Sequence, residues 1–73
     1  MNKVEYFKQF NLQELKELVA ESCAIIKNQE HRLLVVKKAG FDKEAKVLEL
    51  NLFESKIKLG IVRTIIGIKE NGN

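Results

Sequence analysis

Two series of mainly apolar residues with the same spacing lie on either side of Gly40, near the middle of the chain. Their steps alternate between three and four residues, which is the heptad repeat of a helix that packs along another helix. The series are Leu12, Leu15, Val19, Ser22, Ile26, Gln29, Leu33, Val36 and Ala45, Leu48, Leu52, Ser55, Leu59, Val62, Ile66, Lys69. This pattern predicts two long helices, over residues 12–38 and 43–69.

The segment between the two series has the composition of a turn between helices. Lys37 and Lys38 are cations suited to a helix C-terminus. Gly40 readily adopts the left-handed conformation that ends helices, and Asp42 is the predicted N-cap of the second helix. The chain is therefore expected to be all-α, an antiparallel helical hairpin that turns at Gly40-Phe41.

This turn also predicts which positions of the two helices face each other. The expected pairs are Val36 with Ala45, Leu33 with Leu48, Gln29 with Leu52, Ile26 with Ser55, Ser22 with Leu59, Val19 with Val62 and Leu15 with Ile66. Polar Gln29 and Ser22 face apolar residues. We expect these two side chains to fix the register through hydrogen bonds.

The second predicted helix carries another apolar stripe, roughly opposite the first, formed by Leu50, Phe53, Ile57, Ile61 and Ile68. One partner helix cannot cover both sides. The apolar residues of the N-terminal segment 4–10 are too few to shield a helix about 40 Å long. A second copy of the chain is therefore expected to cover the stripe, as a homodimeric four-helix bundle.

An α+β fold is the structural alternative. Residues 48–52 and 57–61 alternate apolar and polar side chains, and GIVRTIIGI is rich in β-branched residues, which is the pattern of a C-terminal β-hairpin. The intervening residues 53–56 contain no Gly, Asn or Pro for a tight turn, which favours the helix.

Length and composition predict a single domain, residues 1–73, that is soluble and cytoplasmic. Apolar residues make up 45% and charged residues 32% of the chain, an ordinary globular balance. Apolar runs such as residues 33–36 are far shorter than the roughly 20 residues of a membrane span. Cys23 is the only cysteine, which excludes an internal disulfide and fits a reducing compartment.

The sequence does not contain the combinations of residues that are usual in a catalytic or metal site. His31 and Cys23 are each the only residue of their type, and neither has a suitable neighbour in sequence. There is no spacing typical of metal ligands and no glycine-rich phosphate loop. We expect no enzymatic activity, no cofactor and no metal.

The C-terminal stretch KLGIVRTIIGIKENGN, residues 58–73, resembles the turn and recognition helix of the Cro/repressor helix-turn-helix class. The matching positions are Leu59, Gly60, Ile61, Arg63, Ile66, Glu70, Asn71 and Gly72. The resemblance implies a DNA-binding regulator with a degenerate helix-turn-helix over residues 52–73, in which Arg63, Thr64 and Lys69 contact DNA. Lys56, however, occupies a position where that class has a small residue.

A second resemblance concerns Val47-Leu48-Glu49-Leu50, which is similar to a run in the helical-hairpin aspartyl-phosphate phosphatases of sporulating bacteria. In that family the run precedes Ser-Gln-x-Leu-Asp, whereas here Asn51, Leu52 and Ser55 replace Ser, Gln and Asp. The resemblance implies a hairpin architecture without the activity.

The leading functional hypothesis is a non-enzymatic interaction or regulatory module, a helical homodimer that binds an unidentified protein partner. Its predicted interface is the stripe of Leu50, Phe53, Ile57, Ile61 and Ile68. DNA binding is the alternative. The net charge of +3 permits a nucleic-acid partner but does not favour one, because basic and acidic residues are interleaved.

Overall fold

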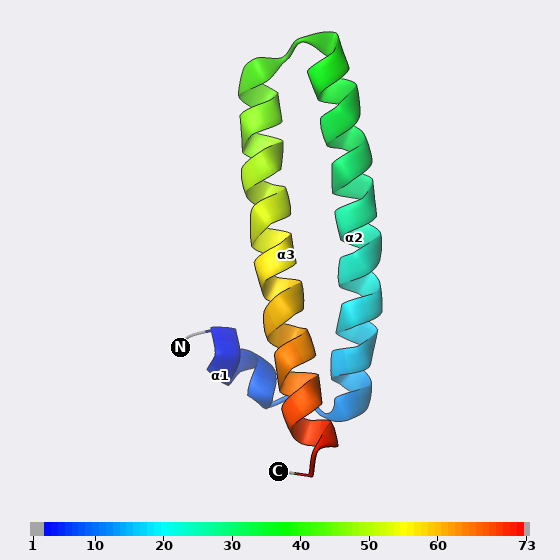
Figure 1. The fold of residues 1–73 in the computed structure, drawn as a ribbon, viewed down its shortest axis with the longest axis vertical. Coiled ribbons are helices and arrows are strands. Elements are labelled where there is room, and N and C mark those ends of the chain that lie inside the picture. The colour runs from blue at the N-terminus through cyan, green and yellow to red at the C-terminus, as the bar shows by residue number, and fades with distance from the viewer. Residues whose placement is uncertain (1–2, 73) are drawn as a thin grey trace.

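The chain folds into an antiparallel helical hairpin with a short third helix at one end (Figure 1). The computed structural model describes residues 3–72, which form helices α1 (Lys3–Lys8), α2 (Leu12–Ala39) and α3 (Asp42–Glu70) and no strand. The predicted all-α hairpin is confirmed. The α+β alternative is wrong, because the region proposed for the β-hairpin lies within one continuous helix.

Local hydrogen bonds define both ends of α2. Asn11 is the N-cap, and its Oδ1 accepts a hydrogen bond from the backbone N–H of Glu14 at 2.9 Å. The Glu14 carboxylate accepts one from the Asn11 N–H at 3.0 Å, which completes a capping box. At the other end Gly40 has φ of 81°, and the Phe41 N–H reaches back to the Val36 carbonyl at 3.2 Å. This is the Schellman arrangement, which satisfies carbonyls of the last turn.

The start of α3 differs from the sequence prediction at one residue. Asp42 was the expected N-cap, but it is already the first helical residue, and Phe41 occupies the N-cap position without a side-chain hydrogen bond. The reason is the tight turn, in which the Asp42 N–H donates to the Gly40 carbonyl at 3.1 Å. Asp42 and Glu44 instead stabilise the first turn through the helix dipole.

Burial follows the two predicted heptad series. All of their positions are buried or half-buried, and Leu15 and Val62 are completely inaccessible. Val19 and Ile66 pack against the core cluster to which these two residues belong. The hairpin is therefore held together along the faces that the spacing identified.

Gln29 does not behave as expected. Its Oε1 atom is buried and accepts no hydrogen bond within the described part of the chain. The prediction that Gln29 fixes the register through a hydrogen bond is therefore wrong as far as its side-chain oxygen is concerned, because that atom has no donor among residues 3–72. Ser22 is buried, with 7% of its surface exposed. All seam positions are buried or half-buried, so packing along the seam maintains the register.

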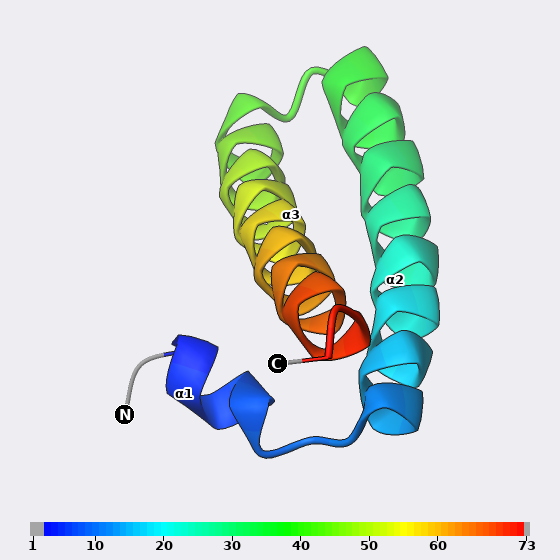
Figure 2. The same ribbon diagram turned by 60° about the horizontal axis from the view of Figure 1, so that its bottom comes forward.

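Helix α1 was not predicted, and it lies beside the C-terminal half of α3 (Figures 1 and 2). Phe7 is 4% exposed and forms the main core cluster with Leu15, Val62 and Ile65. A helix of six residues has little stability of its own, so this packing is what maintains it. Tyr6 makes an edge-to-face contact with Phe7, their ring centroids 5.1 Å apart.

The molecule is long and thin, with extents of 49 × 23 × 14 Å. Its core is one layer of side chains between α2 and α3, widened by α1 at one end. Over residues 3–72, no helix combines the length and apolar character needed to cross a membrane.

Candidate interaction surface on α3

The outer stripe predicted on α3 is largely exposed. Leu50 is 64% exposed, Phe53 62%, Ile57 41% and Ile68 48%. Ile61 is half-buried, because it packs against the cluster that includes Phe7 of α1. Large apolar side chains in water are individually ordinary, but a row along one helix face marks a candidate contact surface.

Within the described chain, the rest of the molecule covers this stripe only around Ile61. Helix α2 packs on the opposite side of α3, where Ala45 and Val62 are buried. Helix α1 reaches the region of Ile61 and Ile65, and Ile65 is only 3% exposed. Helix α1 therefore shields Ile61 and Ile65, but leaves Leu50, Phe53 and about half of Ile68 uncovered.

A hollow of about 390 Å³ lies where α1 meets the stripe. Its lining includes Val4 from α1 and Ile57, Gly60, Ile61, Thr64 and Ile68 from α3. The Thr64 hydroxyl donates to the Gly60 carbonyl at 2.9 Å, so its hydrogen-bonding capacity is partly used within the helix. The hollow thus offers a mainly apolar lining to an incoming side chain.

Gly60, Thr64 and Gly67 were not predicted as parts of this surface, because they are not large apolar residues. A Cβ atom added to Gly60 or Gly67 would meet nothing within 4 Å. The available signal was their spacing, since they continue the heptad line of Leu50, Phe53 and Ile57. Val4 belongs to the N-terminal segment 4–10, and the hollow that it helps to form depends on where α1 packs.

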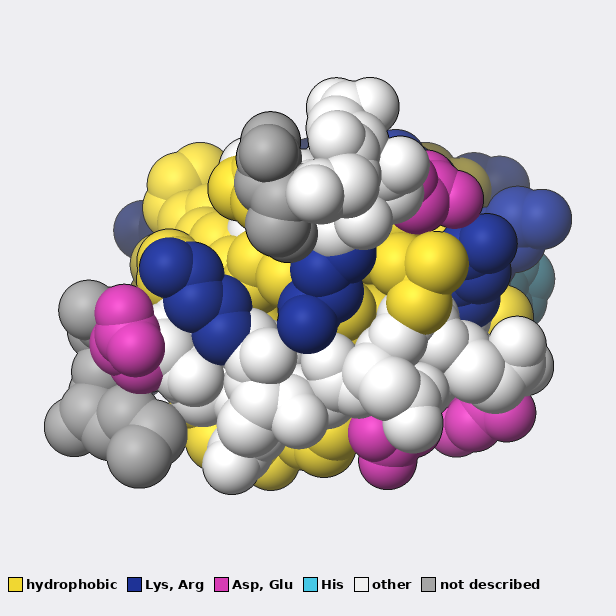
Figure 3. Space-filling model, turned by 90° about the horizontal axis from the view of Figure 1, so that it is seen from below, with side chains coloured by type: hydrophobic (Ala, Val, Ile, Leu, Met, Phe, Trp, Pro, Cys, Tyr) yellow, Lys and Arg dark blue, Asp and Glu magenta, His cyan; other side chains and the backbone are white. Residues whose placement is uncertain are grey.

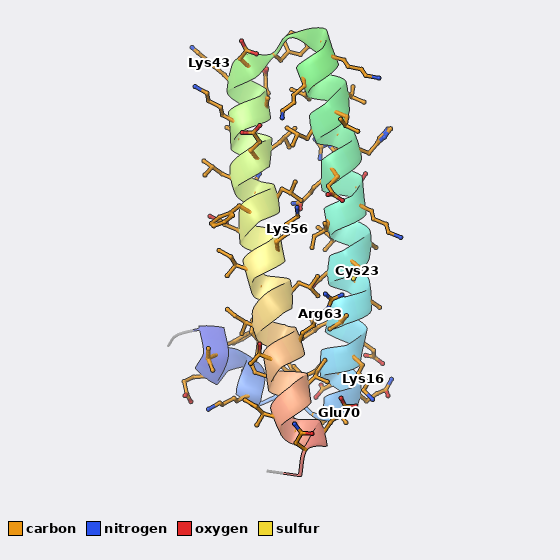
Figure 4. All side chains as sticks on the ribbon, in the orientation of Figure 1. Lys16, Cys23, Lys43, Lys56, Arg63 and Glu70 are labelled. Carbon is orange, nitrogen blue, oxygen red and sulfur yellow. The ribbon has the colours of Figure 1, made fainter. Side chains whose placement is uncertain are left out.

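One flank of the stripe is tied to α2 by a regular ladder of polar contacts (Figure 4). The contacts are Lys37–Glu49 at 3.0 Å, Glu30–Lys56 at 3.8 Å, Lys16–Glu70 at 3.2 Å and Arg63 Nη2 to Cys23 Sγ at 3.8 Å. The ion pairs are about half exposed, so each contributes at most about 1 kcal/mol. Their even spacing shows that the register of the hairpin is constant along its length.

The residues proposed for DNA contact do not form a common surface. Arg63 is directed toward Cys23 of α2 (Figure 4), Thr64 bonds to the backbone of its own helix, and Lys69 is half-buried. Helix α3 continues through Gly60, so the turn expected for a helix-turn-helix over residues 52–73 is absent. A glycine inside a helix costs only about 1 kcal/mol relative to alanine, which the packing on either side can offset.

The other chemically notable residues stay apart. His31 is exposed, and Cys23 is a half-buried free thiol. In the described range 3–72, no group of three His, Cys, Asp or Glu residues could hold a metal ion. Seen from the end that carries α1 and the C-terminus, apolar side chains are visible between those of Lys and Arg (Figure 3). The stripe itself consists of apolar side chains, so apolar contact is the main chemistry that it offers.

Comparison of the chain with models of known protein families, with curated protein sequences and with solved structures finds no match.

Proposed function

We propose that this chain is a small, non-enzymatic protein-interaction module that forms a helical homodimer and regulates a protein partner by binding it. The observation that carries the proposal is the exposed row of Leu50, Phe53 and Ile57 along α3. Moving such side chains out of water contributes roughly 25 cal/mol for each Å² of apolar surface buried. Covering the stripe with another protein would therefore contribute favourable free energy to binding.

The proposal excludes catalysis on the basis of residue chemistry. The one histidine and the one cysteine, His31 and Cys23, lie on different turns of α2, and the cysteine faces Arg63. A nucleophile paired with a base would need the two side chains within hydrogen-bond reach of each other. A cytoplasmic location is part of the proposal and is supported by the single free cysteine, which suits a reducing compartment.

The test compares two aspartate variants as affinity baits. Phe53→Asp places a charge on the stripe, and Leu34→Asp places one on α2 at a residue of similar exposure, 59% against 62%. Cell extract and the free wild-type chain are passed in turn over each immobilised protein. The wild-type protein and Leu34→Asp are expected to retain the same bound protein from them, either a partner from the extract or a second copy of the chain. Phe53→Asp should lose it, because a charge in an apolar contact must be desolvated.

Far-UV circular dichroism on the same samples is the control for folding. Both variants are expected to stay helical, since both residues are exposed. Binding that is equal for all three proteins would remove the stripe from the proposed function.

A further inference from the structure

Building on the interaction surface proposed above, we infer that the occupant of the α3 stripe is a second copy of this chain, packed antiparallel about a two-fold axis beside Ile57 and Gly60. The first observation is the order of side-chain sizes along the heptad line of the stripe. Its N-terminal half contains large residues, Leu50, Phe53 and Ile57, and its C-terminal half contains small ones, Gly60, Thr64 and Gly67.

Antiparallel pairing places each large residue against a small one. With the axis between residues 58 and 59, Ile57 faces the partner's Gly60, Phe53 faces the partner's Thr64, and Leu50 faces the partner's Gly67. A two-fold interface repeats each of these contacts. Parallel pairing would instead place Phe53 against its own copy and Gly60 against its own copy, giving overpacked layers next to empty ones.

The hollow between α1 and α3 lies where this pairing needs space. Thr64 lines the hollow together with Val4 and Ile68, and the volume of the hollow is about 390 Å³. In the antiparallel arrangement the partner's Phe53 enters it. An aromatic side chain seated in a pocket at the centre of a contact is the usual anchor of a protein interface.

The glycines support close approach by a neighbouring helix. Gly60 and Gly67 lie inside α3, where glycine weakens a helix relative to alanine. Nothing in the described chain lies within 4 Å of the Cβ that either position could carry, so folding of the single chain does not need glycine there. Packing of a second helix against these positions supplies the reason, because glycine allows two backbones to approach closely.

The charges at the ends of the line also favour the antiparallel orientation. Lys43 and Lys46 continue the heptad line beyond Leu50, and neither is among the ion pairs formed by residues 3–72. Lys43 lies at the turn end of the hairpin (Figure 4). Antiparallel packing brings both lysines to the C-terminus of the partner's α3, where the negative end of the helix dipole and Glu70 face them together with the basic Lys69. Parallel packing would bring the lysines of the two copies together.

The size of the surface sets the expected strength of association. From Lys46 to Gly67 the helix rises about 32 Å. A standard interface takes about 800 Å² from each partner, about one seventh of the 5468 Å² surface of this chain. The stripe is one face of a single helix, extended by Val4 of α1, so we expect the area buried on each partner to be smaller than this standard value. The dimer is therefore expected to dissociate on dilution.

The first experiment measures molecular mass by analytical ultracentrifugation over a range of concentrations. The wild-type chain is expected to reach twice its 8.4 kDa mass. Phe53→Asp should raise the dissociation constant at least about tenfold, as loss of an anchor does. Leu34→Asp should leave it unchanged. Leu50→Asp is a second stripe variant, since Leu50 is 64% exposed and is not needed for the fold of one chain.

The second experiment measures orientation, using nitroxide labels on Lys43→Cys in a Cys23→Ser background. In the antiparallel dimer the two labels lie at opposite ends, about 46 Å apart along the axis at 1.5 Å per residue. In a parallel dimer they lie side by side, near the helix spacing of about 10 Å. Pulsed electron–electron distance measurements separate the two cases.

Each contrary result overturns a defined part of the inference. A chain that is still monomeric at about 1 mM overturns the second copy as occupant. A dimer with closely spaced labels overturns the antiparallel arrangement, and a dimer that withstands both Phe53→Asp and Leu50→Asp overturns the assignment of the stripe. If the chain is monomeric but retains a partner through Phe53, this inference falls and the interaction role stands. If Phe53 affects neither self-association nor capture, both fall.

Discussion

At the scale of single residues, the missing side chain of glycine has opposite consequences at Gly40 and Gly60. Gly40 has φ of 81°, a conformation that is strained for residues with a Cβ atom. Gly60 lies in the regular interior of α3, next to open space. The turn therefore needs glycine, whereas the fold of the single chain does not need it at Gly60.

Substitution of these two glycines by alanine is predicted to change stability in opposite directions. Gly40→Ala should lower the free energy of unfolding by about 1–2 kcal/mol, because alanine must adopt a left-handed conformation. Gly60→Ala should raise it by up to about 1 kcal/mol. Gly60→Ala is compared in the Phe53→Asp background, so that self-association does not contribute. Urea unfolding followed by circular dichroism gives both values, and a shift of the same sign for both would contradict this account.

At the scale of elements, the three helices differ in how their N-termini are stabilised. Helix α2 begins with the reciprocal hydrogen bonds of Asn11 and Glu14. Helix α3 begins without a side-chain cap and depends on the turn and on its acidic first turn. Helix α1 has only six residues and is maintained by packing. The cap of α2 is therefore the local feature whose loss should be measurable.

Removal of this cap is predicted to destabilise the hairpin. Asn11→Ala should lower the free energy of unfolding by about 1 kcal/mol, because the Glu14 N–H loses its acceptor. Asn28→Ala is the matched control, since Asn28 is exposed in the middle of α2. Alanine is the better helix former there, so this variant should gain a few tenths of a kcal/mol. Equal effects of the two variants on thermal unfolding would argue against the cap.

At the scale of the whole molecule, α1 joins parts of the chain that are distant in sequence. Phe7 packs with Leu15 of α2 and with Val62 and Ile65 of α3, so the N-terminus, the start of α2 and the end of α3 share one cluster. The Lys58 ammonium lies 5.8 Å from the centroid of the Phe7 ring, where a cation–π attraction adds to the contact. The opposite, turn end of the hairpin has no comparable cluster among the described residues. Stability is therefore concentrated at the end that carries α1.

Phe7→Ala is predicted to cost about 3 kcal/mol of unfolding free energy, because it removes a buried ring from a thin core. Tyr6→Ala removes a neighbouring ring that is 48% exposed and should cost about 1 kcal/mol. Chemical denaturation of both variants measures the difference. If Phe7→Ala cost no more than Tyr6→Ala, α1 would not be packed as described.

Much of the hairpin could be predicted from the sequence, because it depends on local periodicity. The heptad spacing of residues such as Leu15 and Val62 identifies the two helices and their buried faces, and Gly40 marks the turn. The same spacing identified the outer stripe, whose residues Leu50 and Phe53 are exposed. The Asn11-x-x-Glu14 signature of the cap was also present in the sequence.

Other features were decided only by the tertiary structure. Helix α1 is too short to have a signal of its own and exists where Phe7 finds a place beside Val62 and Ile65. The partial burial of Ile61 and the hollow at Gly60 follow from that placement. Periodicity in the sequence determines which side of a helix is apolar. What lies against that side depends on contacts between residues far apart in the chain, and these exist only after the chain has folded.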